Sequence, residues 1–197
     1  MSDLTDLFLT GMLAYGPPVL SVALLLGALG VPLPGTLLVL ASGAFARDAV
    51  FNWPLAAALA LLGVAIGDSI GFFVGRYAEH YIPRRISAHP SWTQAQDTFN
   101  QKGGIAIYLT RFLLTPLAVP TNLIAGSSGY TYGRFLAFDL AGELTWVVLF
   151  GSLGYAFAGS WEVINELVGS IGGVLVGAVI LGGGIYWLVR KTVKSEA

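Results

Sequence analysis

Two short proline-containing stretches, GVPLPG at residues 30–35 and LTPLAVPTN at residues 114–122, decide the fold of this chain. Each lies within an apolar segment, residues 19–46 and residues 104–128. Proline lacks a backbone N–H and its ring clashes with the preceding helical turn, so neither segment can form one straight helix. We therefore expect two helical hairpins. The residues that should break them are Pro32, Pro34 and Gly35 in the first, and Pro116 and Pro120 in the second.

The composition of the 197-residue chain is that of an integral membrane protein. It is 55% hydrophobic and 11% charged, whereas soluble domains carry about 25% charged residues. A net charge of −1 without a basic run argues against nucleic acid as a partner. The sequence has no cysteine, and it has no Ser/His/Asp set, metal-ligand spacing or phosphate-cradling glycine loop. We therefore expect neither an enzyme nor a cofactor or metal.

Three apolar segments are long enough to cross a membrane as helices, which takes about 20 residues. They are residues 54–77, 135–157 and 169–189. The arms of the two broken segments have only roughly 10–14 residues, a length that favours re-entrant hairpins over spans. Residues 3–16 fit either an interfacial helix or the first part of a span that bends at the two prolines that follow.

The distribution of Lys and Arg predicts the orientation of the spans. Basic residues gather between the first two spans and after the third: Arg76, Arg84, Arg85, Lys102, Arg134, Arg190, Lys191 and Lys194. These regions, and with them the C-terminus, should be cytoplasmic. The first hairpin then enters from outside and the second from the cytoplasm. We expect an all-α polytopic membrane protein, an inverted repeat of re-entrant hairpin plus transmembrane helix, with an additional C-terminal transmembrane helix.

The chain is expected to be a single membrane domain, residues 1–197, in four parts. They are a first repeat with an N-terminal helix and an outside-entering hairpin (1–77), a cytoplasmic amphipathic connector (78–103), a second repeat with a cytoplasm-entering hairpin (104–157), and a loop with the C-terminal transmembrane helix (158–197). In the connector, apolar residues at helical spacing predict a short helix from Pro90 to Lys102 that ends at Gly103.

Asp68 lies in the middle of the first predicted span. Glycines at every fourth residue, a spacing typical of close helix packing, run beside it: Gly63, Gly67, Gly71 and Gly75. A carboxylate at this depth costs several kcal/mol unless it is paired or hydrated. Asp68 is therefore a candidate for transport, or for a structural hydrogen bond to a hairpin donor.

Asp139 and Glu143 lie four residues apart and so share one face of the second predicted span. Two neighbouring carboxylates resist being charged together, which suits a proton carrier. The alternative interpretation is that Asp139, near the cytoplasmic end, is solvated, whereas Glu143 lies deeper and is favoured as functional. The pair Gly142-Glu143 matches Gly67-Asp68 of the first span, which supports an internal repeat.

Arg111 precedes the break of the second hairpin, so its guanidinium should lie in or near the membrane interior. Such a group requires an acid from the spans or an anionic substrate such as phosphate. A purely structural ion pair with Asp68, Asp139 or Glu143 is the alternative interpretation. Further hydrogen-bonding groups beside the broken backbone are supplied by Thr115, Thr121 and Asn122.

Four stretches of the chain resemble the DedA family, also called SNARE-associated or VTT-domain proteins. They are GVPLPGTLLVLASGAF at 30–45, GDSIGFFVGRY at 67–77, FNQKG at 99–103, and 110–146 with its Arg-Phe, Pro, Ala-Gly, Arg-Phe, Gly and Trp. The resemblance covers most of the chain. It implies a bacterial or archaeal inner-membrane protein with two re-entrant hairpins that face each other.

The resemblance also implies a function in moving lipids across the bilayer, including undecaprenyl phosphate and phospholipids, and in proton-linked membrane homeostasis. Eukaryotic relatives act as lipid scramblases. Two features of the family are missing, because Thr36 stands where many bacterial members carry an acid, and a second hairpin arginine is replaced near Leu117. Only Arg111 is therefore carried over as a functional residue of the family.

The leading hypothesis is a lipid translocase, flippase or scramblase-like transporter of an anionic, phosphate-bearing lipid. Its partners would be membrane lipids, with protons as a candidate coupling ion, and a homo-oligomer is compatible with the sequence. One alternative is a proton- or ion-coupled transporter of a small solute. The other is a non-transporting membrane-organising protein, in which the breaks serve only packing.

Overall fold

The computed structural model describes residues 2–50, 52–78, 80 and 90–159, with only the backbone at 2–5, 90–96 and 98. Every regular element among these residues is a helix. In chain order the helices are α1 (Ser2–Tyr15), α2 (Pro17–Ala28), α3 (Gly35–Arg47), α4 (Trp53–Ala78), α6 (Pro90–Phe112), the short 3-10 helix η2 (Thr115–Leu117), α7 (Ala118–Ser127) and α8 (Tyr132–Ala156). The predicted C-terminal span, residues 169–189, lies outside the described residues.

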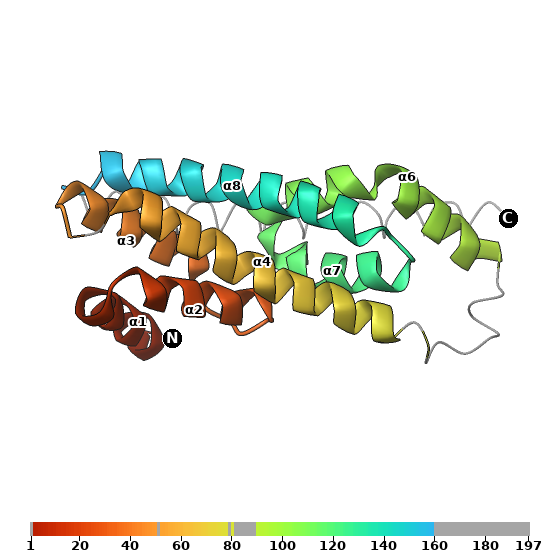
Figure 1. Ribbon diagram of the computed structural model, residues 1–197, viewed down its shortest axis with the longest axis horizontal. Helices are drawn as coiled ribbons and strands as arrows, with labels where there is room; N and C mark the ends of the chain where they lie inside the picture. The colour runs from red at the N-terminus through yellow and green to blue at the C-terminus, as the bar shows by residue number, and fades with distance from the viewer. Residues whose placement is uncertain (1, 51, 79, 81–89, 160–197) are drawn as a thin grey trace, which may run out of the picture. The chain divides into compact units, whose positions relative to one another are not determined.

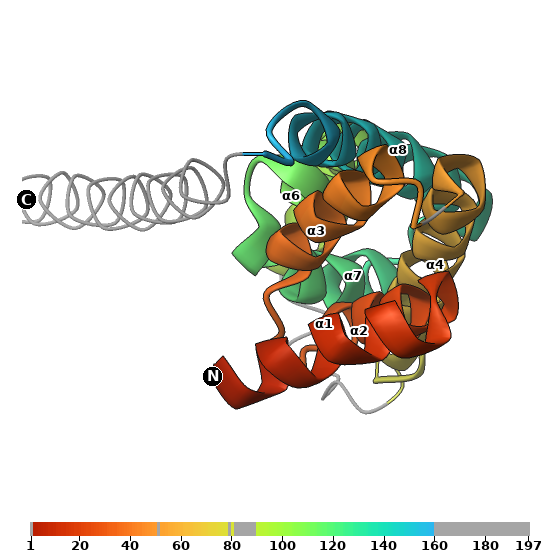
Figure 2. The ribbon, with the colours of Figure 1, turned by 90° about the vertical axis from the view of Figure 1, so that its left-hand side faces the viewer.

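The two longest apolar helices, α4 and α8, are long and apolar enough to cross a membrane. Figure 1 shows α2 and α3 beside one end of these two helices and α6 and α7 beside the other. Helix α1 runs across the direction of α4 and α8 rather than along it (Figures 1 and 2), and it ends before Gly16, whose φ is 76°. The predicted all-helical class and two of its spans are confirmed.

Both proline-containing stretches break the helix in which they lie. The first break separates α2 from α3, and Gly30 there has a φ of 99°, which favours glycine. Short-range bonds replace helical ones, since the N–H of Leu33 donates to the carbonyl of Val31 at 2.7 Å. In the second, α6 ends at Phe112, and Pro116 lies in η2 before α7 begins. Each segment therefore folds back on itself, the first as α2 and α3 and the second as the end of α6 and α7 (Figure 1).

The first hairpin packs against both long helices. Helix α2 lies on α4, where a Cβ on Gly63 would overlap the carbonyl of Ser21 and one on Gly67 would lie 2.6 Å from the Ala28 Cβ. Helix α3 crosses α8 at Gly43, where a Cβ would overlap the carbonyl oxygen of Gly151. Glycine is needed at these positions because the backbones touch.

The second hairpin packs against the same two helices with the partners exchanged. Helix α6 lies on α8, where a Cβ on Gly142 would lie 2.8 Å from the carbonyl oxygen of Tyr108. Helix α7 crosses α4 at Gly126, where a Cβ would overlap the carbonyl oxygen of Phe72. The predicted packing function of the α4 glycines is confirmed, because Gly75 likewise lies against the backbone of α7.

The prediction that the connector helix ends at Gly103 is wrong, because α6 continues through Gly103 and Gly104 to Phe112. The two glycines serve packing instead. A Cβ on Gly103 would lie 2.6 Å from the Phe99 ring, and one on Gly104 would overlap the Phe138 ring of α8. The Phe99 ring belongs to the same helix, four residues earlier, whereas the approach of the Phe138 ring from α8 to Gly104 is not visible in sequence spacing.

Candidate functional site: a buried layer of charged residues

Four helices each direct polar side chains to one buried level beside the second break. Asp68 comes from the middle of α4, Arg111 from the end of α6 and Asn122 from the first turns of α7. Asp139 and Glu143 come from the buried face of α8. We call these five residues the polar layer. All are buried, and Arg111, with 1% of its surface exposed, is among the largest fully buried side chains among the described residues.

Arg111 lies at the centre of the polar layer, among three carboxylates. Its Nη2 lies 2.6 Å from Oδ1 of Asp139. Its Nη1 lies 3.6 Å from Oδ1 of Asp68, and its Nε lies 3.8 Å from Oε1 of Glu143. The long side chain reaches this place by crossing α8 at Gly142, where a Cβ would lie 2.7 Å from Cγ of Arg111. Any side chain at residue 142 would therefore displace the arginine.

Asn122 of α7 links Arg111 to Asp68 of α4. Its Oδ1 accepts a hydrogen bond of 2.6 Å from Nη2 of Arg111, and its Nδ2 donates one of 2.6 Å to Oδ1 of Asp68. The amide offers an acceptor to the cation and a donor to the carboxylate at once. Asn122 also fits against Gly71, where a Cβ would lie 3.2 Å from its own Cβ. The second hairpin is thus joined to α4 at the level of the break.

The polar layer holds more negative than positive groups. Three carboxylates surround one guanidinium, which leaves an excess of two negative charges when all four are ionised. Neither oxygen of Asp139 has a partner in hydrogen-bond geometry, despite the short ion pair. Burying unpaired charge is costly, so added positive charge must accompany this arrangement. One oxygen from each of the three carboxylates lies within 4.8 Å of the others, so their negative charges repel one another when all are ionised.

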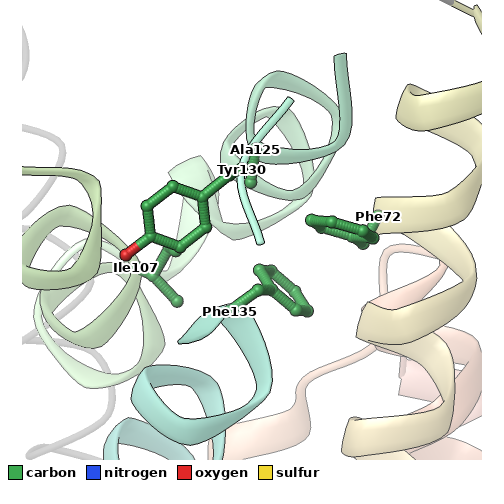
Figure 3. Packing of buried hydrophobic residues seen from close by; sticks show 5 residues of the cluster. All are labelled: Phe72, Ile107, Ala125, Tyr130 and Phe135. Atoms are coloured by element: carbon green, nitrogen blue, oxygen red, sulfur yellow. The ribbon is translucent and has the colours of Figure 1, made fainter. Parts of the chain in front are cut away.

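An apolar layer covers one side of the polar layer. Each helix contributes a residue one turn away from its polar residue, in the direction of the α8 N-terminus: Phe72 of α4, Ile107 of α6, Ala125 of α7 and Phe135 of α8. Figure 3 shows these side chains packed together with Tyr130. The guanidinium carbon of Arg111 lies 5.8 Å from the centre of the Phe135 ring. The apolar layer therefore closes the arginine off from that end of the bundle.

Several predicted site residues converge in the polar layer. Arg111 contacts all three acids that were considered as its partners, and Asn122 completes the group. The interpretation of Asp139 as a solvated residue is wrong, because the side chain is 0% exposed. Helix α6 covers the part of α8 on which it lies, and sequence spacing within α8 could not show this.

The remaining predicted residues shape the breaks. The hydroxyl of Thr115 donates to the carbonyl of Arg111 at 3.4 Å, one of the carbonyls left free where α6 ends. Thr121 is buried on α7, and within the described residues its side chain makes no hydrogen bond to the polar layer. The prolines lie as predicted in or beside the breaks: Pro32 and Pro34 between α2 and α3, Pro116 in η2, and Pro120 in the first turn of α7.

A family model and several similar membrane proteins match this chain. Residues 31–156 match the family described as the VTT domain. An uncharacterized membrane protein of Synechocystis is 28% identical over 159 residues, which are 78% of this chain and 72% of the relative. Protein DedA of Escherichia coli is 29% identical over 157 residues, 76% of this chain and 71% of the relative. Inner membrane protein YohD of the same organism is 28% identical over 135 residues, 68% of each chain. No solved structure matches the chain.

Proposed function

This chain belongs to the VTT-domain family of membrane proteins, and from this membership and the polar layer we propose that it moves an anionic, phosphate-bearing lipid across the bilayer. Undecaprenyl phosphate and phospholipids are the lipid classes considered. The observation that carries the proposal is the buried Arg111, placed between two membrane helices where the second hairpin is broken. A membrane protein keeps an ionised arginine at such a place at a considerable cost, which points to function.

The arrangement of the hairpins supports an inverted repeat. A Cβ on Gly43 would approach the carbonyl of Gly151 and the N–H of Tyr155, which is four residues later on α8. A Cβ on Gly126 would approach the carbonyl of Phe72 and the N–H of Arg76, four residues later on α4. The two crossings are therefore built alike, with α3 corresponding to α7 and α8 corresponding to α4. Paired, broken segments of this kind are typical of transporters.

The same correspondence indicates that the part of the chain described by the structure carries one polar layer, not two. Gly63 faces Ser21 as Gly142 faces Tyr108, which aligns α2 with α6. Gly142 therefore corresponds to Gly63, and the match of Gly142-Glu143 with Gly67-Asp68 that the sequence suggested is wrong. When these helices are aligned, each charged or amide residue of the polar layer corresponds to a buried apolar residue in the other half. The pairs are Arg111 with Leu24, Asn122 with Val39, Asp139 with Ala60, and Asp68 with Val147. Substrate recognition is therefore assigned to the second hairpin, with the first hairpin as its apolar counterpart.

Protons supply the positive charge that the polar layer requires in this proposal. Arg111 is held by Asp139 and Asn122, each at 2.6 Å, so an anionic headgroup must compete with a carboxylate for it. A proton on that carboxylate removes the competing charge and releases the guanidinium to the headgroup. Entry of the lipid headgroup is thereby coupled to the uptake of protons at the acids.

Transport by the purified protein tests the proposal. Full-length protein in vesicles should move a phosphatidic acid with a fluorescent acyl chain between leaflets, measured by dithionite bleaching of the outer leaflet. A glucosyl lipid with the same labelled chain serves as the uncharged control and should move at the rate of protein-free vesicles. A protein that moves neither lipid but takes up inorganic phosphate would favour the small-solute transporter instead. A protein that moves nothing would favour a membrane-organising function.

The proposed topology places the α4 N-terminus outside and the α6 N-terminal half in the cytoplasm. These regions lie at opposite ends of α8, because Trp53 packs on Gly151 whereas Arg134 bonds the carbonyl of Asn100. In intact cells, Asn52→Cys should therefore react with a membrane-impermeant thiol reagent, and Asp97→Cys should react only after permeabilisation. Labelling of Asp97→Cys from outside would contradict the inverted repeat.

We propose that protons enter the polar layer at Glu143, because it is the most exposed of the five residues, with 6% of its surface accessible. Glu143→Gln keeps the size of the side chain but cannot ionise, so the transport rate should lose its dependence on pH between about 5 and 8. Asp48→Asn, an exposed carboxylate at the end of α3, is the control and should keep the wild-type profile. An unchanged profile in Glu143→Gln would place proton exchange elsewhere.

A further inference from the structure

Three buried donor nitrogens near the polar layer have no hydrogen-bond partner. They are Nε and Nη1 of Arg111 and the indole Nε1 of Trp146. Trp146 is 4% exposed, so water does not readily reach its N–H. A buried donor without an acceptor loses its hydration without compensation, and native proteins rarely keep one. The two arginine nitrogens lie 3.6 Å from Asp68 and 3.8 Å from Glu143, too far for hydrogen bonds, so these two charged N–H groups and the indole N–H are not hydrogen-bonded.

Trp146 lies next to the arginine along α8. Arg111 crosses α8 at Gly142, and Trp146 is four residues further, which places it one turn away on the same face. On its other side the indole contacts the start of α3, where a Cβ on Gly35 would lie 3.7 Å from Cη2 of Trp146. The tryptophan thus lies between the polar layer and the first break, on the side of Arg111 opposite to Phe135.

We propose that Trp146 binds the phosphate of the transported lipid, with its indole N–H and the two Arg111 nitrogens that make no hydrogen bond, Nε and Nη1, as donors to the phosphate oxygens. This inference rests on the proposed function and adds a residue from α8 to its site. A phosphate offers three strong acceptor oxygens, which matches three unpaired donors better than a single carbonyl would. Asp68, which faces Nη1 of Arg111, and the two acids of α8, Asp139 and Glu143, do not oppose the phosphate once they carry protons, because a protonated carboxyl also donates a hydrogen bond.

Binding of a short-chain phosphatidic acid to the purified full chain in detergent tests the inference. Dihexanoyl phosphatidic acid should raise the thermal unfolding midpoint of the wild-type protein with increasing concentration. Trp146→Phe keeps an aromatic ring without the N–H and should require about tenfold more lipid for the same shift. Replacement of Trp146 by benzothienylalanine, which keeps two fused rings with sulfur in place of N–H, should give the same loss. Trp53→Phe is the matched control, because Trp53 of α4 packs on Gly151 of α8, the helix that carries Trp146. This variant should bind as wild type.

The outcomes separate this inference from the proposed function. Wild-type affinity in the benzothienylalanine variant would overturn the inference, because the ring alone would then suffice. An absent shift in the wild-type protein would overturn it as well. A Trp146-dependent shift in a protein that moves no labelled lipid would keep the inference and contradict lipid transport. Transport of phosphatidic acid with the same concentration dependence in wild type and Trp146→Phe would contradict the inference alone.

Discussion

Replacing Arg111 by alanine is expected to lower the free energy of unfolding by about 3–5 kcal/mol. The side chain is 1% exposed and is the cation shared by Asp68, Asp139 and Glu143. Its removal leaves three carboxylates in an apolar interior without a counter-charge and leaves Oδ1 of Asn122 without its donor. The thermal unfolding midpoint of the purified variant, measured in detergent, should fall far below that of the wild-type protein.

Two comparisons show whether this loss comes from charge. Arg47→Ala removes an exposed arginine that donates to the carbonyl of Ala156 at 2.9 Å, and it should cost about 1 kcal/mol. The double variant Arg111→Ala/Asp139→Asn keeps two carboxylates, the same negative excess as the wild-type group, and should regain much of the lost stability. Equal instability of the single and double variants would mean that Arg111 acts through its volume and not through its charge.

Gly126→Ala should be the most damaging single-methyl substitution in the second hairpin. The added Cβ would overlap the carbonyl oxygen of Phe72 and lie 2.6 Å from the backbone nitrogen of Arg76. Backbone atoms cannot rotate away as a side chain can, so α7 must separate from α4, which we expect to cost about 3 kcal/mol. The separation would also move Asn122, one turn earlier on α7, away from Asp68.

Gly133→Ala is the control for this substitution. Gly133 lies in the first turn of α8, and a Cβ there would meet no atom within 4 Å. Alanine should be tolerated or stabilise the helix by about 0.4–1 kcal/mol. Thermal unfolding midpoints of the two variants provide the comparison. A Gly126→Ala protein as stable as Gly133→Ala would contradict the close crossing of α7 and α4.

The breaks in the fold could be predicted from the sequence because their cause is local. Proline at Pro34 or Pro116 prevents a continuous helix whatever surrounds it. The glycine spacing of α4 likewise predicts close packing, but it does not identify the partner. The structure shows that α2 and α7 divide this face, with Gly63 against α2 and Gly75 against α7. Helix α6 continues through Gly103 and Gly104, where Gly104 packs against the Phe138 ring of α8, and the sequence prediction failed there.

The candidate site was predictable in its members but not in its arrangement. Charged residues within apolar segments are conspicuous in a sequence, so Asp68, Arg111 and Glu143 could be selected without a structure. Their convergence depends on how α4, α6 and α8 pack, which no spacing within one helix reveals. Trp146 entered the sequence analysis only as part of the family resemblance, and its unpaired indole N–H is visible only in three dimensions.

The measurement that tests the central claim most directly is lipid transport by the Arg111→Ala/Asp139→Asn double variant in vesicles. Because this variant should fold, loss of transport could not be attributed to instability, and its unfolding midpoint is measured alongside. If Arg111 binds the anionic headgroup, the folded variant should move labelled phosphatidic acid no faster than protein-free vesicles. Transport at the wild-type rate would show that Arg111 serves only to neutralise buried acids, and it would contradict the proposed headgroup site.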